Sequence, residues 1–380
     1  MLSNQDIVRI GADFCPGVEP IGIRELTAGN VNATYRLDYD AADRSRSLVL
    51  QRINTEAFRD PDALMENIRL VTEHIRAALV AAGTDPARRV LEFLPAADGG
   101  LLHREPDGSC WRCYRFVDGV TAYDRIESPA LFREAGRGFG AFQTMLADFP
   151  ADRLSETIPF FHDTPRRYEA FRASVAADAA GCVGALAEEI AFFDSRAGKM
   201  HGIVDRMASG ELPLRVTHND TKLNNVLIDN ETHRALCVID LDTVMPGSVL
   251  YDFGDAVRYG ACTAAEDEPD TTRIGFDMEL FRVFAEGFLS ETAGRLTDAE
   301  LTLLPLGAEV ITCELAMRFL TDYIDGDRYF KIRYPEHNLV RARAQMKLLT
   351  EIEAHRDEMD ACIEAWRSAG CGREAGSRNA

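Results

Sequence analysis

The spacing of apolar residues predicts a strand-rich first part of the chain. Ile7, Ile10 and Phe14 recur at helical spacing, which predicts a short amphipathic helix over residues 3–14. A second, longer helix is predicted over residues 61–82 by the same spacing. Short apolar runs between polar turns predict strands at residues 21–26, 34–39 and 48–50, and two or three further strands from residues 90–94, 101–102 and 110–117. These strands indicate a small antiparallel sheet.

After Asp118-Gly119 the pattern changes to long helical periodicities, which are interrupted mainly by one central motif. Two of the expected helices cover residues 165–180 and 185–207. The glycines of the segment 136–140 lie inside a helical pattern, and no strand leads into them. We therefore interpret them as residues that let a helix pack closely, and not as a phosphate-binding loop.

These patterns predict an α+β fold with two lobes and a tail. The N-terminal lobe would be small, built on an antiparallel sheet, and would span residues 1–117. The C-terminal lobe, residues 118–369, would be large and mainly helical. The small and polar residues 370–380 are typical of a disordered tail.

Charge and cysteine content exclude several classes of protein. The 380 residues carry a formal net charge of -20, which argues against a nucleic-acid partner or an anionic membrane surface. Nine cysteines include the pair Cys110 and Cys113, but no second pair follows, so we interpret them as ordinary thiols in a strand. No stretch has the length of a membrane span, and the first residues do not resemble a signal peptide. We expect a cytoplasmic protein.

The chemistry is concentrated in the central motif, residues 216–228. Asp220 is followed by Lys222 and by Asn225, and apolar runs flank this polar block. Phosphoryl transfer needs a carboxylate that orients the attacking hydroxyl, and oxygen ligands that hold Mg²⁺. We predict that Asp220 is the catalytic base, that Lys222 neutralises the transferring phosphate, and that Asn225 gives its amide oxygen to the metal.

A predicted hairpin follows this block and returns to Asp240. Residues 226–228 and 235–239 would form its strands, which would bring Asp240 back beside Asn225 as a second metal ligand. Asp242 could reach a second ion. His218 is interpreted as a brace of the loop. The triplet that begins at Asp252 spells a kinase metal motif, but we expect Asp252 and Asp255 to begin a helix or to hydrogen-bond the catalytic loop.

Weaker signals point to a nucleotide site in the first part. Gly29, with Asn30 beside it, lies in a turn where backbone N–H groups could approach a phosphate. No lysine ends the strand at residues 48–50, so Arg52, with Gln51 behind it, is the candidate phosphate-binding cation. Glu66 could pair with Arg52 or belong to a solvated acidic face.

A late block, residues 317–331, mixes planar charged groups with aromatic rings. Arg318, Asp322 and Tyr329 are its candidate substrate-binding residues, because such groups suit a sugar-binding cleft. A helix end followed by a charged loop would give the same pattern.

With these motifs, the chain resembles the aminoglycoside phosphotransferase/choline kinase superfamily, and within it the bacterial N-acetylhexosamine 1-kinases. The resemblance rests on segments 29–35, 48–54, 218–225, 239–247 and 250–255, and on the late block. It implies a protein-kinase-like two-lobe fold, with ATP and Mg²⁺ as cofactors. The acceptor would be the anomeric hydroxyl of an N-acetylhexosamine.

The resemblance also implies roles for individual residues. Asp220 would be the base, and Asn225 and Asp240 the metal ligands. Arg318, Tyr329 and Asn225 would contact the sugar. The adenine-binding hinge would comprise Tyr114, Phe116 and Val117. The chain has Asn30 and Ala33 where the kinases it resembles carry His and Asp, so the identity of the sugar stays open.

Other functions fit parts of the pattern. The acceptor could be another hexose, an amino alcohol or an aminoglycoside, although Arg318 favours a neutral sugar over a cation. A dinuclear metallohydrolase would use His218, Asp220, Asp240 and Asp242, and a binding-only pseudokinase would explain the missing lysine. We expect a small-molecule partner and a monomer or weak homodimer.

Overall fold

The computed structural model describes residues 3–27, 31–40 and 47–377, with side chains as far as residue 368. The chain divides into two compact units. Unit 1 comprises Met1–Thr121, Asp152–Pro159 and Leu227–Met245. Unit 2 comprises Ala122–Ala151, Phe160–Val226 and Pro246–Ala380. The first unit therefore includes two later segments that the predicted boundary at residue 117 assigned to the second lobe.

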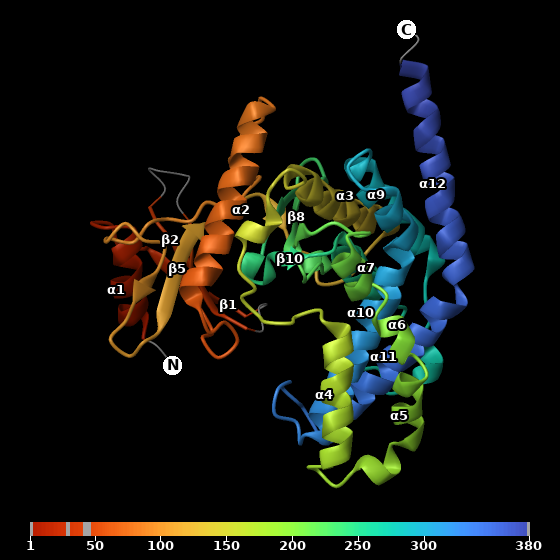
Figure 1. The fold of residues 1–380 in the computed structure, drawn as a ribbon. Helices are drawn as coiled ribbons and strands as arrows, with labels where there is room; N and C mark the ends of the chain where they lie inside the picture. Colours follow the sequence, from red (N-terminus) through yellow and green to blue (C-terminus); the bar gives the residue numbers. More distant parts are fainter. Residues whose placement is uncertain (1–2, 28–30, 41–46, 378–380) are drawn as a thin grey trace. The chain divides into compact units, whose positions relative to one another are not determined.

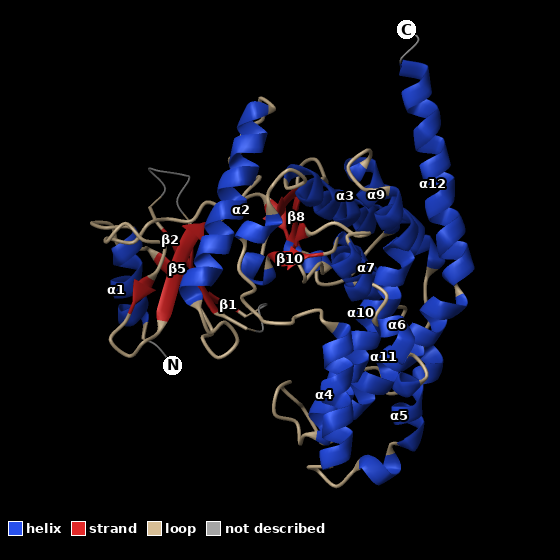
Figure 2. Cartoon of the chain, in the orientation of Figure 1, coloured by secondary structure: helices blue, strands red, loops and turns tan. Residues whose placement is uncertain are grey.

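Unit 1 is built on a five-stranded antiparallel sheet in the order β1-β2-β3-β5-β4 (Figure 2). Its strands are β1 (Gly22–Leu26), β2 (Ala33–Asp38), β3 (Leu48–Arg52), β4 (His103–Arg104) and β5 (Cys110–Arg115). The register pairs Gln51 with Thr34 on one side and with Arg112 on the other. The predicted antiparallel sheet is thus confirmed.

The two or three further strands expected from residues 90–94, 101–102 and 110–117 are two, β4 and β5, and residues 90–94 form neither of them. That segment makes only an isolated bridge, between Phe93 and Tyr114. Leu94 N–H donates to Cys113 O and Arg115 N–H donates to Glu92 O, so the backbone follows the edge of β5 for a short distance. A segment that hydrogen-bonds to an edge strand at only a few positions has the same apolar pattern as a true strand. The sequence therefore does not distinguish the two.

Two helices complete the first part of unit 1. The first, α1 (Asn4–Phe14), begins with a capping box in which Ser3 accepts the Asp6 N–H. It buries Ile7, Ile10 and Phe14 against the sheet, in a core shared with Trp111. The second, α2 (Pro61–Ala81), begins at the N-cap Asp60 with proline in its first turn. Both match the predicted helices.

The later segments of unit 1 add a small sheet in the order β6-β8-β9. Its strands are β6 (Val120–Thr121), β8 (Val226–Asp229) and β9 (Ala235–Val238). The predicted hairpin is present, and Asp229 Oδ1 closes its turn by accepting the N–H of Thr232 at 2.9 Å. Asn67 of α2 donates to the Val244 carbonyl, which ties the segment after the hairpin to the helix. The short helices η2 (Ala151–Arg153) and η5 (Leu241–Thr243) flank these segments.

Unit 2 is mainly helical, as predicted (Figure 1). Its central helix is α10 (Asp298–Ile324), against which α4, α8, α11 and α12 pack. The other α-helices are α3 (Pro129–Met145), α4 (Thr164–Ala177), α5 (Ala187–Asp194), α6 (Ala197–Met200), α7 (Val204–Ser209), α8 (Val249–Gly260), α9 (Met278–Thr292), α11 (His337–Ala354) and α12 (Arg356–Ser377). The short helices are η3 (Val183–Ala185), η4 (Leu223–Asn225) and η6 (Thr271–Arg273). A two-stranded sheet pairs β7 (Arg215–Thr217) with β10 (Met245–Gly247).

Two helix predictions in this unit differ from the structure. The single helix expected over residues 185–207 is divided into α5, α6 and α7, because the chain turns after Asp194 and again after Met200. Gly198 and Gly202 lie in this stretch and weaken a continuous helix there. The backbone of α12 is helical to Ser377, past residue 370, where we expected a disordered tail.

The predicted glycine contact is confirmed. A Cβ atom on Gly136 would collide with the carbonyl oxygen of Phe284, and one on Gly140 would lie 2.5 Å from that of Phe288. Gly287 of α9 has the same relation to Arg133 of α3. The two helices therefore meet backbone to backbone.

We predict that Gly140→Ala destabilises the protein by about 1–3 kcal/mol, because the added methyl group must push α9 away from α3. The matched control is Gly198→Ala, which also adds a methyl group within a helix but meets no atom within 4 Å. That control should be neutral or stabilising by up to about 1 kcal/mol, since alanine favours helix more than glycine does. Urea denaturation of both variants checks the prediction, and equal stabilities would contradict it.

Candidate functional site

The central motif forms a loop between β7 and the short helix η4. Its backbone N–H groups are held by two carboxylates of α8. Asp252 accepts the N–H of His218 at 2.9 Å and that of Asn219 at 2.8 Å. Asp255 accepts the N–H of Thr221 at 3.0 Å. The predicted role of these two residues, as hydrogen-bond partners of the catalytic loop, is confirmed.

Asp252 lies in the interior of unit 2, where it is 1% exposed. Gln143 of α3 donates to its Oδ2 at 2.7 Å and to the Val216 carbonyl at 3.0 Å. Burial raises the pKa of Asp252, against the opposing effects of His218 and of the donors around it. A buried carboxylate that accepts several hydrogen bonds fixes the loop firmly, because any displacement would leave a buried polar group unpaired.

Asp255 is part of a charged group at the same helix. Arg258 donates to its Oδ1 from both Nε and Nη2, and the third nitrogen of Arg258, Nη1, pairs with Glu266 at 3.0 Å. Burial would raise the pKa of Asp255, but Arg258 and Lys222 outweigh burial and lower it. The carboxylate is therefore charged when it binds the loop.

The residues predicted to perform catalysis meet at the end of this loop. Lys222 Nζ lies 2.6 Å from Asp220 Oδ1, and both side chains are partly exposed. Burial alone would lower the pKa of Lys222, but the carboxylates of Asp220 and Asp255 outweigh it and raise the pKa. Asn225 donates from Nδ2 to the backbone carbonyl and to Oδ2 of Asp220. The structure thus brings together the predicted base, cation and amide.

The buried side chain of His218 braces this loop. Its ring is fully buried and meets Phe139 and Phe142 of α3 edge-on. Its Nδ1 accepts the N–H of Asp220 at 3.3 Å. The predicted structural role is therefore confirmed, and that ring nitrogen is used within the loop.

The predicted metal ligands belong to different units, and each suits a hard cation. In unit 2, Asn225 uses its amide nitrogen for Asp220, which leaves the amide oxygen to serve as a ligand. In unit 1, Asp240 follows the hairpin with an exposed side chain and a positive φ of 57°, a conformation uncommon outside glycine. Within the described residues, no group of three or more His, Cys, Asp or Glu side chains is arranged to hold a metal ion.

Asp242 is engaged within unit 1. Asn32 donates to its Oδ2 at 2.6 Å, and Arg112 Nη1 lies 2.5 Å from its Oδ1. Arg112 is 2% exposed and also donates to Gln51 at 3.0 Å. This pairing neutralises Asp242, so the second-ion role predicted for it would require Arg112 to move.

Arg112 is the residue of unit 1 that the sequence interpretation missed. Burial would lower its pKa, but Asp242 outweighs burial and raises it. The available signal was a charged residue inside the otherwise apolar strand 110–114, because charges seldom lie within buried strands without a partner. Arg52, the predicted phosphate-binding cation, is exposed at the end of β3.

The remaining nucleotide-site predictions are placed as follows. Tyr114 is partly buried against Phe93, and burial raises its pKa. Phe116 carries Arg36 over its ring at 3.9 Å, and Val117 is buried. Gly29 and Asn30 lie outside the described residues.

Glu66 does not pair with Arg52. Its carboxylate lies 2.7 Å from Arg69, one turn further along α2, so the intrahelical pair replaces the one considered from the sequence.

The late block lines a pocket of about 140 Å³ between α4, α10 and the loop that follows α10, which we call the α4–α10 pocket. Arg318, Asp322 and Tyr329 all line it, as does Arg167 of α4, which the sequence interpretation missed. The ring of Tyr329 is 70% exposed and lies 5.8 Å from the Arg318 guanidinium. The three predicted substrate residues are therefore neighbours.

Asp322 also has a structural role at this pocket. Its carboxylate accepts the N–H groups of Arg328, Tyr329 and Phe330 at 2.8–2.9 Å, and Asn338 donates to it at 2.9 Å. These four donors hold the loop against α10. Direct contact of Asp322 with a substrate stays a prediction.

Comparison with known proteins identifies a family model that matches this chain. A family model described as the phosphotransferase enzyme family matches residues 22–280. Among the described helices, none has the length and apolar character of a membrane-spanning segment.

Several solved structures share the fold. A microcompartment-associated aminopropanol kinase is 19% identical with a TM-score of 0.64, and the match covers 94% of this chain and 99% of that one. A choline kinase from Cryptosporidium parvum Iowa II is 13% identical with a TM-score of 0.56, covering 96% and 99%. A spectinomycin phosphotransferase in complex with ADP and spectinomycin is 14% identical with a TM-score of 0.51, covering 93% and 97%. The predicted protein-kinase-like α+β fold is confirmed.

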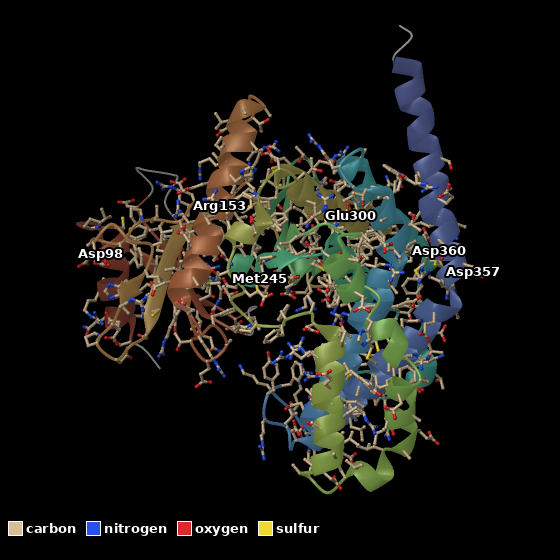
Figure 3. The ribbon with its side chains drawn as sticks, in the orientation of Figure 1. Asp98, Arg153, Met245, Glu300, Asp357 and Asp360 are labelled. Atoms are coloured by element: carbon tan, nitrogen blue, oxygen red, sulfur yellow. The ribbon has the colours of Figure 1, made fainter. Side chains whose placement is uncertain are left out.

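We predict that Asp252→Asn lowers the free energy of unfolding by about 2–3 kcal/mol, because an amide has one oxygen for the three donors that Asp252 binds and directs its own N–H group at one of them. The control is Asp357→Asn, which changes an exposed residue of α12 (Figure 3). It should alter stability by less than about 0.5 kcal/mol. Urea denaturation measures both, and hydrogen exchange at the amides of His218 and Asn219 should accelerate only in Asp252→Asn. Unchanged exchange there would contradict the proposed bracing.

Proposed function

Because the chain belongs to the phosphotransferase enzyme family, we propose that it transfers the γ-phosphate of ATP, with Mg²⁺, to a hydroxyl group of a sugar. The cluster of Asp220, Lys222 and Asn225 carries this proposal. The resemblance of its motifs to N-acetylhexosamine 1-kinases makes the anomeric hydroxyl of an N-acetylhexosamine the first acceptor to test.

In the proposed mechanism, Asp220 accepts a hydrogen bond from the acceptor hydroxyl and takes its proton as the oxygen attacks phosphorus. The backbone bonds to Asp252 and Asp255 fix the direction of the Asp220 carboxylate, which reduces the entropy lost in aligning the reactants. Lys222, which lies 2.6 Å from Asp220, would supply positive charge near the transferred group.

Asn225 and Asp240 are the proposed ligands of the metal. Asn225 directly precedes the first strand of the β8–β9 hairpin, and Asp240 follows its second strand by two residues. When bound, Mg²⁺ would neutralise the charge of the ATP phosphates. The Nδ2 bond of Asn225 to Asp220 would couple the position of this ligand to that of the base.

The acceptor is proposed to bind in the α4–α10 pocket. Some of the similar structures are kinases of amino alcohols or aminoglycosides, so a cationic acceptor is the main alternative within this family. Arg167 and Arg318 line the pocket, however, and would repel a cation. This observation favours a sugar without positive charge.

We predict that Asp220→Asn lowers kcat by at least about 100-fold, because the amide cannot accept the proton of the acceptor. A coupled assay of ADP release with hexosamines, hexoses and amino alcohols measures this effect. The control Asp205→Asn changes an exposed carboxylate of α7 and should leave kcat unchanged.

Each alternative predicts a different outcome, which the ADP-release assay, a nucleotide-free hydrolysis assay and an ATP-binding measurement together distinguish. Unchanged turnover in Asp220→Asn would reject the assigned base. Hydrolysis without nucleotide would indicate a metallohydrolase. Binding of ATP without transfer to any acceptor would indicate a pseudokinase.

A further inference from the structure

Two guanidinium groups line the α4–α10 pocket together with the carboxylates of Asp322 and Asp325. Arg318 is surrounded by aromatic rings, with Phe161, Tyr329 and Phe330 at 5.6–5.8 Å from its Cζ. Arg167 donates from Nη2 to the Phe161 carbonyl at 3.2 Å. Its Nε is buried and has no hydrogen-bond partner. Neither arginine forms a salt bridge with any residue that the structure describes.

The carboxylates near the pocket are committed to other groups. Asp322 accepts the four loop donors described above, and Asp325 accepts the hydroxyl of Ser174 at 3.1 Å. Glu314 is buried and accepts from His162 at 2.9 Å and from Thr164 at 2.6 Å. Among the described residues, none of these three carboxylates forms a salt bridge with Arg167 or Arg318, although Glu314 interacts with both arginines electrostatically.

This arrangement lowers the pKa of Arg167. Burial lowers its pKa first, and repulsion by Arg318 lowers it further, while Glu314 and Asp163 only partly compensate. A desolvated cation beside a like charge is costly unless an anion completes the arrangement. Arginine pairs are well suited to oxyanions, because each guanidinium presents two parallel N–H donors.

We propose that the α4–α10 pocket binds an oxyanion group of the acceptor, a carboxylate or a phosphate ester, through Arg167 and Arg318. This inference rests on the proposed function and narrows its substrate class from sugars in general to acidic sugars. Tyr329 would cover the apolar face of the sugar ring beside the anionic group.

The pocket and the loop that carries Asp220 both belong to unit 2. Phe161, which accepts from Arg167 and faces Arg318, directly precedes His162. His162 contributes electrostatically to the lowered pKa of Asp255, and Asp255 accepts the N–H of Thr221, the residue after Asp220.

The test measures binding and turnover with matched sugars. Calorimetry, with and without ADP and Mg²⁺, compares glucuronate and glucose 6-phosphate with glucose and glucosamine. At least one anionic sugar should bind about 10- to 100-fold more tightly than glucose, and glucosamine should bind no better than glucose. The more tightly bound of the two anionic sugars identifies the oxyanion as carboxylate or phosphate.

Arg167→Gln and Arg318→Gln should each remove most of this preference and raise the KM of the anionic sugar, with a smaller effect on the KM of ATP. Arg318→Lys should restore part of the preference, because it keeps the charge and loses the paired donors. The matched control is Arg166→Gln, which removes an equal charge from the preceding position of α4, where Arg166 is exposed and lies over the Phe160 ring. It should keep the preference unchanged.

Equal affinity for glucose and both anionic sugars, or tighter binding of glucosamine, would overturn the proposal. So would loss of the preference in Arg166→Gln to the same extent as in Arg318→Gln. Binding of an anionic sugar with no phosphate transfer would support the pocket and reject the proposed kinase function. Transfer to neutral or cationic acceptors alone would support the kinase function and reject the anionic acceptor.

Discussion

The site depends on hydrogen bonds from the catalytic loop to two carboxylates inside unit 2. Asp252 and Asp255 are on α8, one turn apart. Their carboxylate oxygens accept loop N–H groups that have no backbone partner, because the loop is irregular. The helix can present them only because its own backbone approaches α10 closely at Gly254 and Gly307. The packing of α8 against α10 therefore determines the position of Asp220, since a shift of α8 would displace the loop that carries this residue.

Local charge differs from total charge in this protein. The chain as a whole carries a net charge of -20, yet buried or half-buried arginines occupy the places where anionic ligands are proposed to bind. Arg112 is neutralised by Asp242, whereas Arg167 and Arg318 have no such partner. Desolvation makes a few placed cations more effective than many exposed ones, because water screens them less.

The sequence predicted best those features that depend on short, continuous segments. Residues 216–228 revealed the loop that brings Asp220, Lys222 and Asn225 together, and the glycines at 136–140 revealed a helix contact, because each pattern is complete within a few turns. Arg112 and Arg167 were missed because their significance depends on partners distant in sequence, Asp242 and Arg318. Residues 152–159 and 227–245 could not be assigned to unit 1 from the sequence for the same reason, since they join it only through tertiary contacts.

The main-chain path of the loop after α10 depends largely on one carboxylate. Asp322 binds three successive backbone N–H groups, and every residue except proline offers such a group. The side chain of Phe330 packs against the core of unit 2, whereas those of residues 328 and 329 are exposed. Residues 328 and 329 can therefore exchange their side chains while the main-chain path is retained. Among proteins built on this plan, ligand preference can diversify at these two positions at little cost in folding stability, so natural variation and directed evolution can explore the same short segment.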